Sequence, residues 1–309
     1  MLLRWMIGAA AAVLFSTSAT GEAASQAVML RAGDGVSISG LAYTADHPKA
    51  IVLLFHQAES SKAEYATIAP RLVAAGFTAL AIDQRSGGSL YGSNDTARRL
   101  GKPASYEQAK PDLEAALDWA TAKHLPVVLW GSSYSASLVF EVAAEHPQEV
   151  SAVMAFSPGE YFDDTKAVAR AAAQVHAPIY VTSSPDADEV NDAKAILAAS
   201  PARSKTQYVP QFGVHGASTL IEAQDPKGAA ENWKHALAFL NALPAARPGS
   251  RSPARLPSPR ADIKPVATKP LVTEPQKLAR RCGLLFRRRN SRSGRSLEPG
   301  RRSRCARTK

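Results

Sequence analysis

Apolar and polar residues follow two different rhythms between about residues 27 and 243. Short apolar runs predict strands that are buried on both faces of a sheet. Longer segments with apolar residues three and four positions apart predict helices. Strands are expected at 36–43, 51–55, 77–82, 127–130, 150–156, 179–182 and 206–209, and helices at 65–75, 106–123, 135–145, 165–174, 190–199 and 229–243.

Alternating strands and helices predict an α/β fold with three layers, in which a mostly parallel central sheet carries helices on both faces. Asp34-Gly35 ahead of the first strand indicates a hairpin. Only about twenty residues separate Phe156 from Pro178, so we expect no large cap domain and an open cleft. In such sheets the chemistry gathers in loops after the carboxyl ends of the strands.

The two ends of the chain differ from this domain, which we place at residues 27–243. Residues 1–23 resemble a signal peptide, with Arg4 ahead of a short apolar run and small residues after it. We therefore expect an exported protein, periplasmic or secreted, with no transmembrane span once the signal is removed. Residues 244–309 are rich in Pro, Arg and Ser without periodicity, and this composition predicts a disordered basic tail.

The formal net charge of +10 is distributed unevenly along the chain. Residues 245–309 hold 19 Lys and Arg against 3 Asp and Glu, which leaves a net charge of −6 on the rest. The tail is expected to be solvated, with contact to an anionic membrane or nucleic acid as the alternative. No specific nucleic-acid module is expected. Both cysteines, Cys282 and Cys305, lie in the tail, so the domain has no disulfide framework.

A strand, a tight turn and a helix mark the sharpest candidate site, Gly131-Ser132-Ser133-Tyr134-Ser135. A serine nucleophile in a G-x-S-x-G turn needs small residues two places before and after it. Gly131 and Ser135 hold these places around Ser133, although Ser135 departs from the usual glycine. The alternative is an ordinary helix N-cap made by Ser132 or Ser133.

A serine hydroxyl is a weak nucleophile until a base takes its proton. His215, in Gly213-Val214-His215-Gly216, follows the last strand and is the candidate base. An acid that orients the histidine is expected between the two in chain order. The loop after residues 179–182 offers Asp186, which we prefer because it lies nearest the strand end. Asp188 is the alternative acid, and Glu189 qualifies less well.

Acyl transfer also needs N–H donors for the developing oxyanion. The backbone N–H of Tyr134, directly after the nucleophile, is one candidate. Gln57, in Phe55-His56-Gln57-Ala58 after an early strand, is the other. We expect His56 and Tyr161 to line the substrate pocket.

Taken together, these motifs resemble the α/β-hydrolase superfamily, in particular dienelactone-hydrolase-like proteins and small bacterial serine esterases. The resemblance covers about residues 28–243 and rests on His56-Gln57, Asp83-Gln84-Arg85-Ser86-Gly87-Gly88, the turn at Ser133 and the loop at His215. It implies an α/β-hydrolase fold. Dienelactone hydrolases use a cysteine nucleophile, and Ser133 in that place points to esters more generally.

The sequence thus predicts an exported serine hydrolase that cleaves a carboxylic ester of a small or exposed substrate through an acyl-enzyme on Ser133. The alternative is a catalytically impaired binding protein with the same fold, because Gln57 and Ser135 replace the usual glycines. We expect neither a cofactor nor a metal: G-x-x-x-x-G-K-[ST] and H-E-x-x-H are both absent from the sequence.

Overall fold

An eight-stranded sheet forms the centre of the computed structural model, which describes residues 25–244. Its order is β1-β2-β4-β3-β5-β6-β7-β8, and β2 alone runs against its neighbours while β3 to β8 are parallel. The strands are β1 (Ser25–Arg31), β2 (Ser37–Tyr43), β3 (Ile51–Phe55), β4 (Thr78–Ile82), β5 (Val127–Ser132), β6 (Val150–Phe156), β7 (Ile179–Thr182) and β8 (Lys205–Tyr208).

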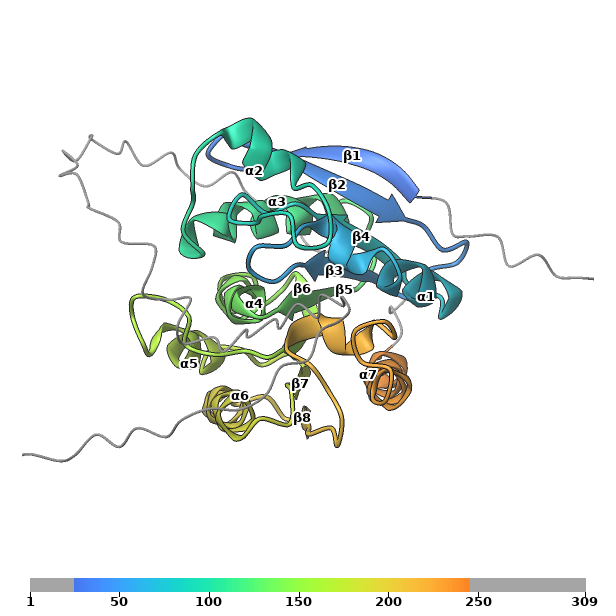
Figure 1. The fold of residues 1–309 in the computed structure, drawn as a ribbon, viewed down its shortest axis with the longest axis vertical. Helices are drawn as coiled ribbons and strands as arrows, with labels where there is room; N and C mark the ends of the chain where they lie inside the picture. Colours follow the sequence, from blue (N-terminus) through green and yellow to red (C-terminus); the bar gives the residue numbers. More distant parts are fainter. Residues whose placement is uncertain (1–24, 245–309) are drawn as a thin grey trace, which may run out of the picture. The chain divides into compact units, whose positions relative to one another are not determined.

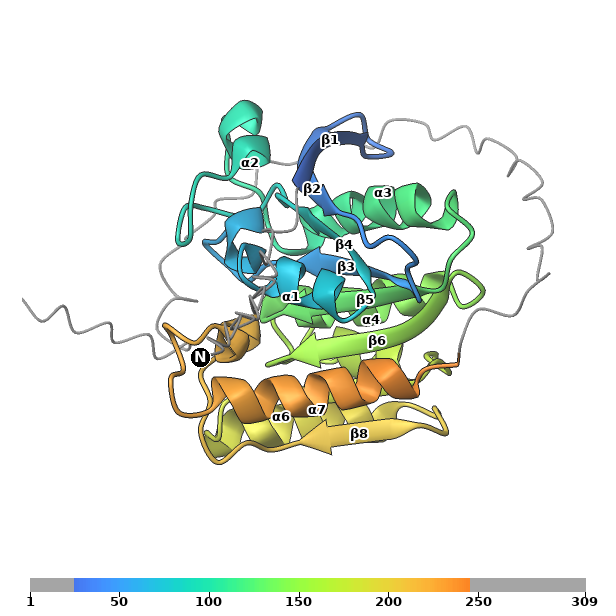
Figure 2. The same cartoon turned by 90° about the vertical axis from the view of Figure 1, so that its right-hand side faces the viewer.

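Helices cover both faces of this sheet (Figures 1 and 2). Strand residues of alternate parity point to opposite faces. Ile51, Leu53 and Phe55 of β3 therefore pack with α3 (Lys110–Thr121), α4 (Tyr134–Glu145), α5 (Ala167–Ala172) and α6 (Ala187–Ala199). Val52 and Leu54 pack on the opposite face with α1 (Ile68–Ala74) and α7 (Ala229–Ala242). The predicted three-layer α/β architecture is confirmed.

Several predicted boundaries agree with the structure, notably those of β3, β6 and β7. The hairpin is formed by β1 and β2, with Gly35 at a φ of 88° in its turn. The connection from β6 to β7 contains one six-residue helix, α5, and no inserted cap domain.

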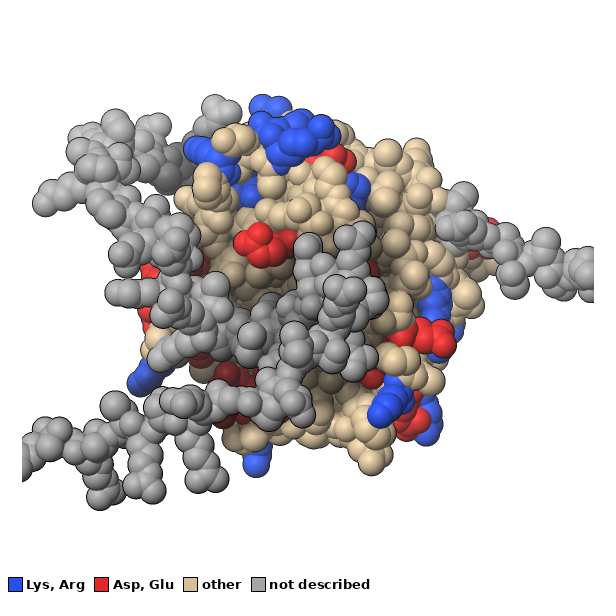
Figure 3. Space-filling model, in the orientation of Figure 1, with Lys and Arg blue, Asp and Glu red and all other residues tan. Residues whose placement is uncertain are grey.

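One α-helix was not predicted. α2 (Asp95–Leu100) begins after Asn94, whose side chain accepts from the N–H of Ala97, and ends at Gly101 in a left-handed conformation. Lys and Arg side chains gather on the surface over α2 (Figure 3). They include Arg98, Arg99 and Lys102 at the end of this helix.

The signal peptide predicted at residues 1–23 and nearly all of the tail predicted at 244–309 lie outside the described residues. Within residues 25–244, none of the helices combines the length and the apolar character that crossing a bilayer requires.

Candidate active site

The turn from β5 into α4 places Ser133 at the carboxyl edge of the sheet. Its φ of 59° and ψ of −125° lie outside the usual regions for a non-glycine residue, and its N–H donates to Phe156 O at 2.8 Å. A Cβ on Gly131 would stand 2.3 Å from the carbonyl oxygen of Ser135, so only glycine fits there. The Ser133 side chain makes no cap hydrogen bond to α4, which excludes the N-cap interpretation of this serine.

Ser135 takes the place where glycine is usual, and its backbone is helical rather than left-handed. Its hydroxyl donates to His56 O at 2.5 Å and accepts from Gln84 Nε2 at 2.5 Å. The departure from glycine therefore puts no strain on the β5 turn (residues 131–135). Instead, the hydroxyl ties this turn to the loops that follow β3 and β4.

His215 lies in the histidine loop (residues 209–216), between β8 and the 3-10 helix η3 (Gly216–Leu220). Its Nε2 is 2.8 Å from Ser133 Oγ, although 82 residues separate the two in sequence. Its Nδ1 is 2.9 Å from Glu189 Oε1. The structure thus brings together the predicted nucleophile and the predicted base.

The acid partner differs from the prediction, because neither Asp186 nor Asp188 reaches His215. Asp186 lies directly before α6, and its carboxylate accepts from the N–H groups of Asp188 and Glu189 at 3.0 and 3.5 Å. The first N–H groups of a helix have no acceptor within the helix, so the Asp186 carboxylate caps α6 and is not directed at His215. Asp188 points to solvent. Glu189, in the first turn of α6, is the carboxylate that contacts His215.

The second oxygen of Glu189 is also held. Oε2 accepts from Ser157 Oγ at 2.7 Å and from the N–H of Ser184 at 3.1 Å. Burial alone would raise the pKa of Glu189, but the hydrogen bond and charge of His215, with those two donors, lower it to about 2. Ser157 also accepts from the N–H of Gly216 at 2.9 Å. The acid, the base and the end of β6 are therefore fixed to one another.

Of the two predicted oxyanion donors, the Gln57 N–H is not free. It donates to Glu64 Oε2 at 2.9 Å, so this part of the prediction is wrong. Tyr134 is the first residue of α4, and its N–H therefore has no acceptor within the helix. Its ring is anchored by stacking on Tyr106, with centroids 4.3 Å apart, and by hydrogen bonds from Gln84 and Ser86 to its hydroxyl.

Of the two predicted pocket residues, His56 is excluded from a pocket by its burial and Tyr161 is not. His56 is fully buried, and its ring bonds Gln57 O through Nδ1 at 2.8 Å and the N–H of Gln84 through Nε2 at 3.0 Å. Burial lowers the pKa of His56 to about 4, so this neutral ring supports the loops and does not line a pocket. Tyr161 is half-buried and donates to Ser157 O at 3.0 Å, and its place in a substrate pocket stays a prediction.

Glu64 is a member of the site that sequence reasoning missed. It lies in the 3-10 helix η1 (Lys62–Tyr65) and is 1% exposed. Besides the Gln57 N–H, it accepts from Ser132 Oγ at 2.8 Å, and that oxygen accepts from the N–H of Ala217 at 2.8 Å. Burial raises the pKa of Glu64 to about 7, although these hydrogen bonds oppose the rise. Only the tertiary fold brings these groups together.

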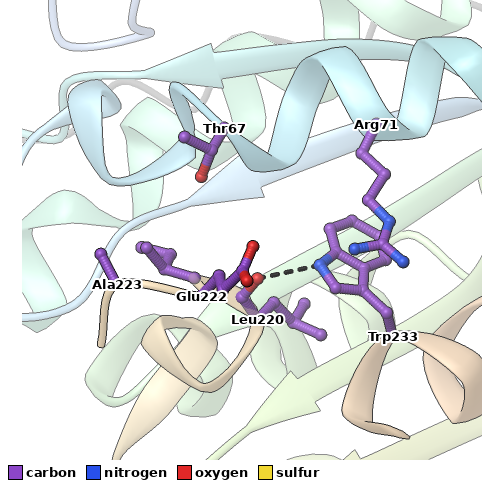
Figure 4. Close-up of a pocket in the computed structure, with 7 residues that line it drawn as sticks. Thr67, Arg71, Leu220, Glu222, Ala223 and Trp233 are labelled. Carbon is purple, nitrogen blue, oxygen red and sulfur yellow. Dashed lines mark hydrogen bonds between the residues drawn. The ribbon is translucent and has the colours of Figure 1, made fainter. Parts of the chain in front are cut away.

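Other polar or hollow regions lie apart from Ser133. Within residues 25–244, the closely spaced potential metal ligands are Glu114, Glu145 and His146. Glu145 and His146 lie at the far end of α4, about 17 Å from its start, Glu114 lies on α3, and Lys110 already pairs with Glu145. A cavity of about 580 Å³ lies between η1–α1 and η3–α7 (Figure 4). There Arg71 lies over the ring of Trp233, whose Nε1 donates to Leu220 O.

A smaller cavity, of about 370 Å³, opens beside the β3 loop (residues 56–60). Ser86, which donates to the Tyr134 hydroxyl, is part of its wall. The whole lining consists of Glu59, Arg85, Ser86, Gly87, Ala97, Gly101, Lys102, Pro103 and Ala104. Its lining includes Glu59 of the β3 loop but none of Ser133, Tyr134, Glu189 and His215.

Comparison with known proteins places this geometry in context. The family model described as serine aminopeptidase, S33, matches residues 46–223. The structure is similar to a dienelactone hydrolase from Anabaena variabilis, at 20% identity and a TM-score of 0.58 over 72% of this chain and 99% of that one. An esterase from Pyrococcus furiosus is similar at 16% identity and a TM-score of 0.56, over 75% and 98% of the two chains. No curated protein matches the chain.

Proposed function

Because the chain belongs to the serine aminopeptidase S33 family of α/β-hydrolases, we propose that it is a serine hydrolase that cleaves carboxylic esters. The observation that carries this proposal is the line of contacts from Ser133 Oγ through both ring nitrogens of His215 to Glu189. A hydroxyl, an imidazole and a carboxylate in this order make an activated nucleophile.

In the proposed reaction, Ser133 Oγ attacks the ester carbonyl carbon while His215 Nε2 takes the hydroxyl proton. The tetrahedral intermediate collapses when the bond to the alcohol oxygen breaks, and His215 delivers its proton to that oxygen. Water then attacks the acyl-enzyme with the same proton transfers, which releases the acid and restores Ser133. Glu189 holds Nδ1–H of His215 and stabilises the imidazolium that forms in each step.

The Tyr134 N–H is the first donor that we propose for the oxyanion. With the Gln57 N–H bound to Glu64, the next amide of the β3 loop, Ala58 N–H, is the second. The loop folds back at this point, because the Ser60 N–H donates to Gln57 O at 3.3 Å. Each such donor contributes about 3 kcal/mol to transition-state stabilisation.

Two features support an ester of small or exposed substrates. The short β6–β7 connection contains one six-residue helix and no cap domain. The Anabaena and Pyrococcus proteins are described as a dienelactone hydrolase and an esterase. An aminoacyl p-nitroanilide, tested beside p-nitrophenyl acetate, separates aminopeptidase from esterase activity.

The test is labelling with a fluorophosphonate probe, followed by peptide mapping, together with turnover of p-nitrophenyl acetate. We expect labelling on Ser133 and its loss in Ser133→Ala. Labelling that survives this substitution contradicts the assignment of the nucleophile. A wild-type protein that is folded but neither labelled nor active favours the alternative, a binding protein with this fold.

We further propose that the protein works outside the cytoplasm, since residues 1–23 have the charge and apolar pattern of a signal peptide. Fractionation of cells that express the full chain, with mass determination of the exported product, tests this. An uncleaved protein in the cytoplasm contradicts it.

A further inference from the structure

The buried carboxyl of Glu64 is not used by the proposed reaction, yet three loops of the site meet on it. Its Oε2 accepts from Gln57 N–H in the β3 loop, and its Oε1 accepts from the Ser132 hydroxyl in the β5 turn. Ser132 Oγ in turn accepts from the N–H of Ala217, two residues after His215. One carboxylate therefore connects the loops after β3, β5 and β8.

The surroundings of Glu64 suit a hydrogen-bonded carboxylate rather than an ion pair. The neighbouring Lys62 pairs with Asp83 and Asp95, at 2.6 and 2.9 Å. A buried carboxylate is costly unless donors satisfy it. Here the donors are the Gln57 backbone amide and the hydroxyls of Ser132 and Ser60, which belong to the β3 loop and the β5 turn.

We propose that Glu64 is a positioning residue whose carboxylate holds the β3 loop and the β5 turn in register with the histidine loop, and that uptake of a proton by Glu64 weakens this register. This inference rests on the proposed function. A protonated carboxyl carries an O–H, and the Gln57 N–H and Ser132 O–H that face its two oxygens are themselves donors. One of the two hydrogen bonds is then lost or reversed.

The groups around Glu64 set the pH at which this happens. Burial raises its pKa to about 7, and the positive form of His215 opposes that rise. The titratable and charged side chains nearest it on the adjoining segments are His56 after β3, Lys62 and Tyr65 on η1, Asp83 after β4, Tyr91 before α2 and His215 before η3. The phenols stay neutral here, since burial raises the pKa of both Tyr65 and Tyr91.

The decisive variant is Glu64→Gln, which keeps the shape of the side chain but presents an N–H donor to Ser132, as the protonated acid does. We expect kcat for p-nitrophenyl acetate to fall about tenfold near pH 9 with little change in KM, because misplaced catalytic groups affect the transition state more than the bound ester. The wild type should approach the variant near about pH 5, where Glu64 is protonated. The ratio of wild-type to Glu64→Gln kcat/KM should therefore fall from about ten at high pH toward one at low pH, with its midpoint near pH 7.

The matched control is Glu141→Gln, the same change at a half-buried carboxyl of α4 whose pKa is also raised. It should follow the wild-type pH profile. A ratio of wild-type to Glu64→Gln activity that is the same at every pH overturns the inference, and so does equal activity throughout.

If Glu64→Gln does not fold, Ser132→Ala keeps the carboxyl and removes its link to Ala217. We expect that variant to lose about tenfold in kcat, whereas unchanged turnover refutes the proposal. Failure of the proposed function is a separate result: the wild type is then inactive and unlabelled at every pH.

Discussion

Two substitutions, at positions three residues apart in sequence, decide which carboxylate orients His215. Glu189→Gln removes the carboxylate that contacts His215 Nδ1, and Asp186→Ala removes the carboxylate that caps α6. If Glu189 orients the base, only the first substitution should affect turnover. If Asp186 does, the opposite holds.

The size of the effect follows from the electrostatics of Glu189. Its pKa falls from an ordinary 4.5 to about 2 despite burial, which corresponds to about 3 kcal/mol of interaction with the groups around it. The side chain is 24% exposed, so solvent screening reduces this to about 2 kcal/mol. This energy includes the hydrogen bonds from Ser157 and Ser184, so it is an upper limit for the interaction with His215, equivalent to at most about thirtyfold in kcat. An amide in place of the carboxylate also favours the wrong tautomer of His215, which brings the expected loss to about 10³- to 10⁴-fold.

The assay compares kcat for p-nitrophenyl acetate and the rate of fluorophosphonate labelling in the wild type and both variants. Asp186→Ala should keep wild-type kcat and lose about 1 kcal/mol of stability through the helix cap, or about 2–4 °C in Tm. Glu189→Gln should fold normally and be almost inactive. Retention of more than about a tenth of wild-type kcat by Glu189→Gln would refute the assignment.

Three further predictions concern the β5 turn and Glu64. Ser135→Gly restores the usual glycine yet should lower stability by about 1–3 kcal/mol, because His56 O loses its donor and Gln84 Nε2 loses one of its two acceptors; thermal unfolding measures it, and a rise in Tm contradicts it. Gly131→Ala should abolish labelling or soluble expression, since its Cβ would stand 2.3 Å from a backbone oxygen; normal activity would show that the turn adapts. The raised pKa of Glu64 favours the folded state below pH 4.5 and loses this contribution as pH rises to about 7. The free energy of unfolding in urea should therefore fall by about 3 kcal/mol for the wild type, relative to Glu64→Gln, as pH rises across this range. Parallel curves of unfolding free energy against pH would contradict the shift.

The strands and the order of the proposed catalytic groups could be predicted because they depend on local pattern. Continuous apolar runs such as residues 51–55 are typical of strands covered on both faces, and glycine at 131 is required by the turn itself. The positions of Ser133 and His215 after strand ends then follow from the parallel sheet. No long-range information is needed for any of these.

The acid was predicted wrongly because reach along the chain is a poor guide once a helix begins. Asp186 lies nearer the strand end, but its short side chain satisfies the first amides of α6. Glu189, three residues further on, has one more methylene and points back toward the strand end from the first turn of the helix. The sequence holds a signal for these two roles, because an Asp followed three residues later by a Glu is typical of a helix start in which the Asp is the N-cap.

Glu64 and the amide of Gln57 could not be assigned from sequence, because their partners come from distant segments. Ser132 is 68 residues from Glu64, and the contact depends on how η1 packs beneath the β5 turn. Gln57 lies where an oxyanion donor is expected, yet the direction of its N–H is decided by a carboxyl on another element. A motif predicts which residues are near a site, while the tertiary contacts decide which of their atoms are available.

The site is held together by buried hydroxyl groups, and this explains how it stays rigid without disulfides. Ser157 joins the acid to the Gly216 amide, Ser132 joins Glu64 to Ala217, and Ser135 joins the β5 turn to His56. Each hydroxyl both donates and accepts, so its removal takes one hydrogen bond from each of two polar groups, at a cost of about 1–3 kcal/mol where such a group is left without a partner. A loop that moves must break such a pair, and in a buried, low-dielectric setting this cost is not recovered from water. Fixed geometry at Ser133 and His215 is therefore a consequence of polar pairing beneath the loops, and substitutions at these serines should lower kcat without touching the substrate.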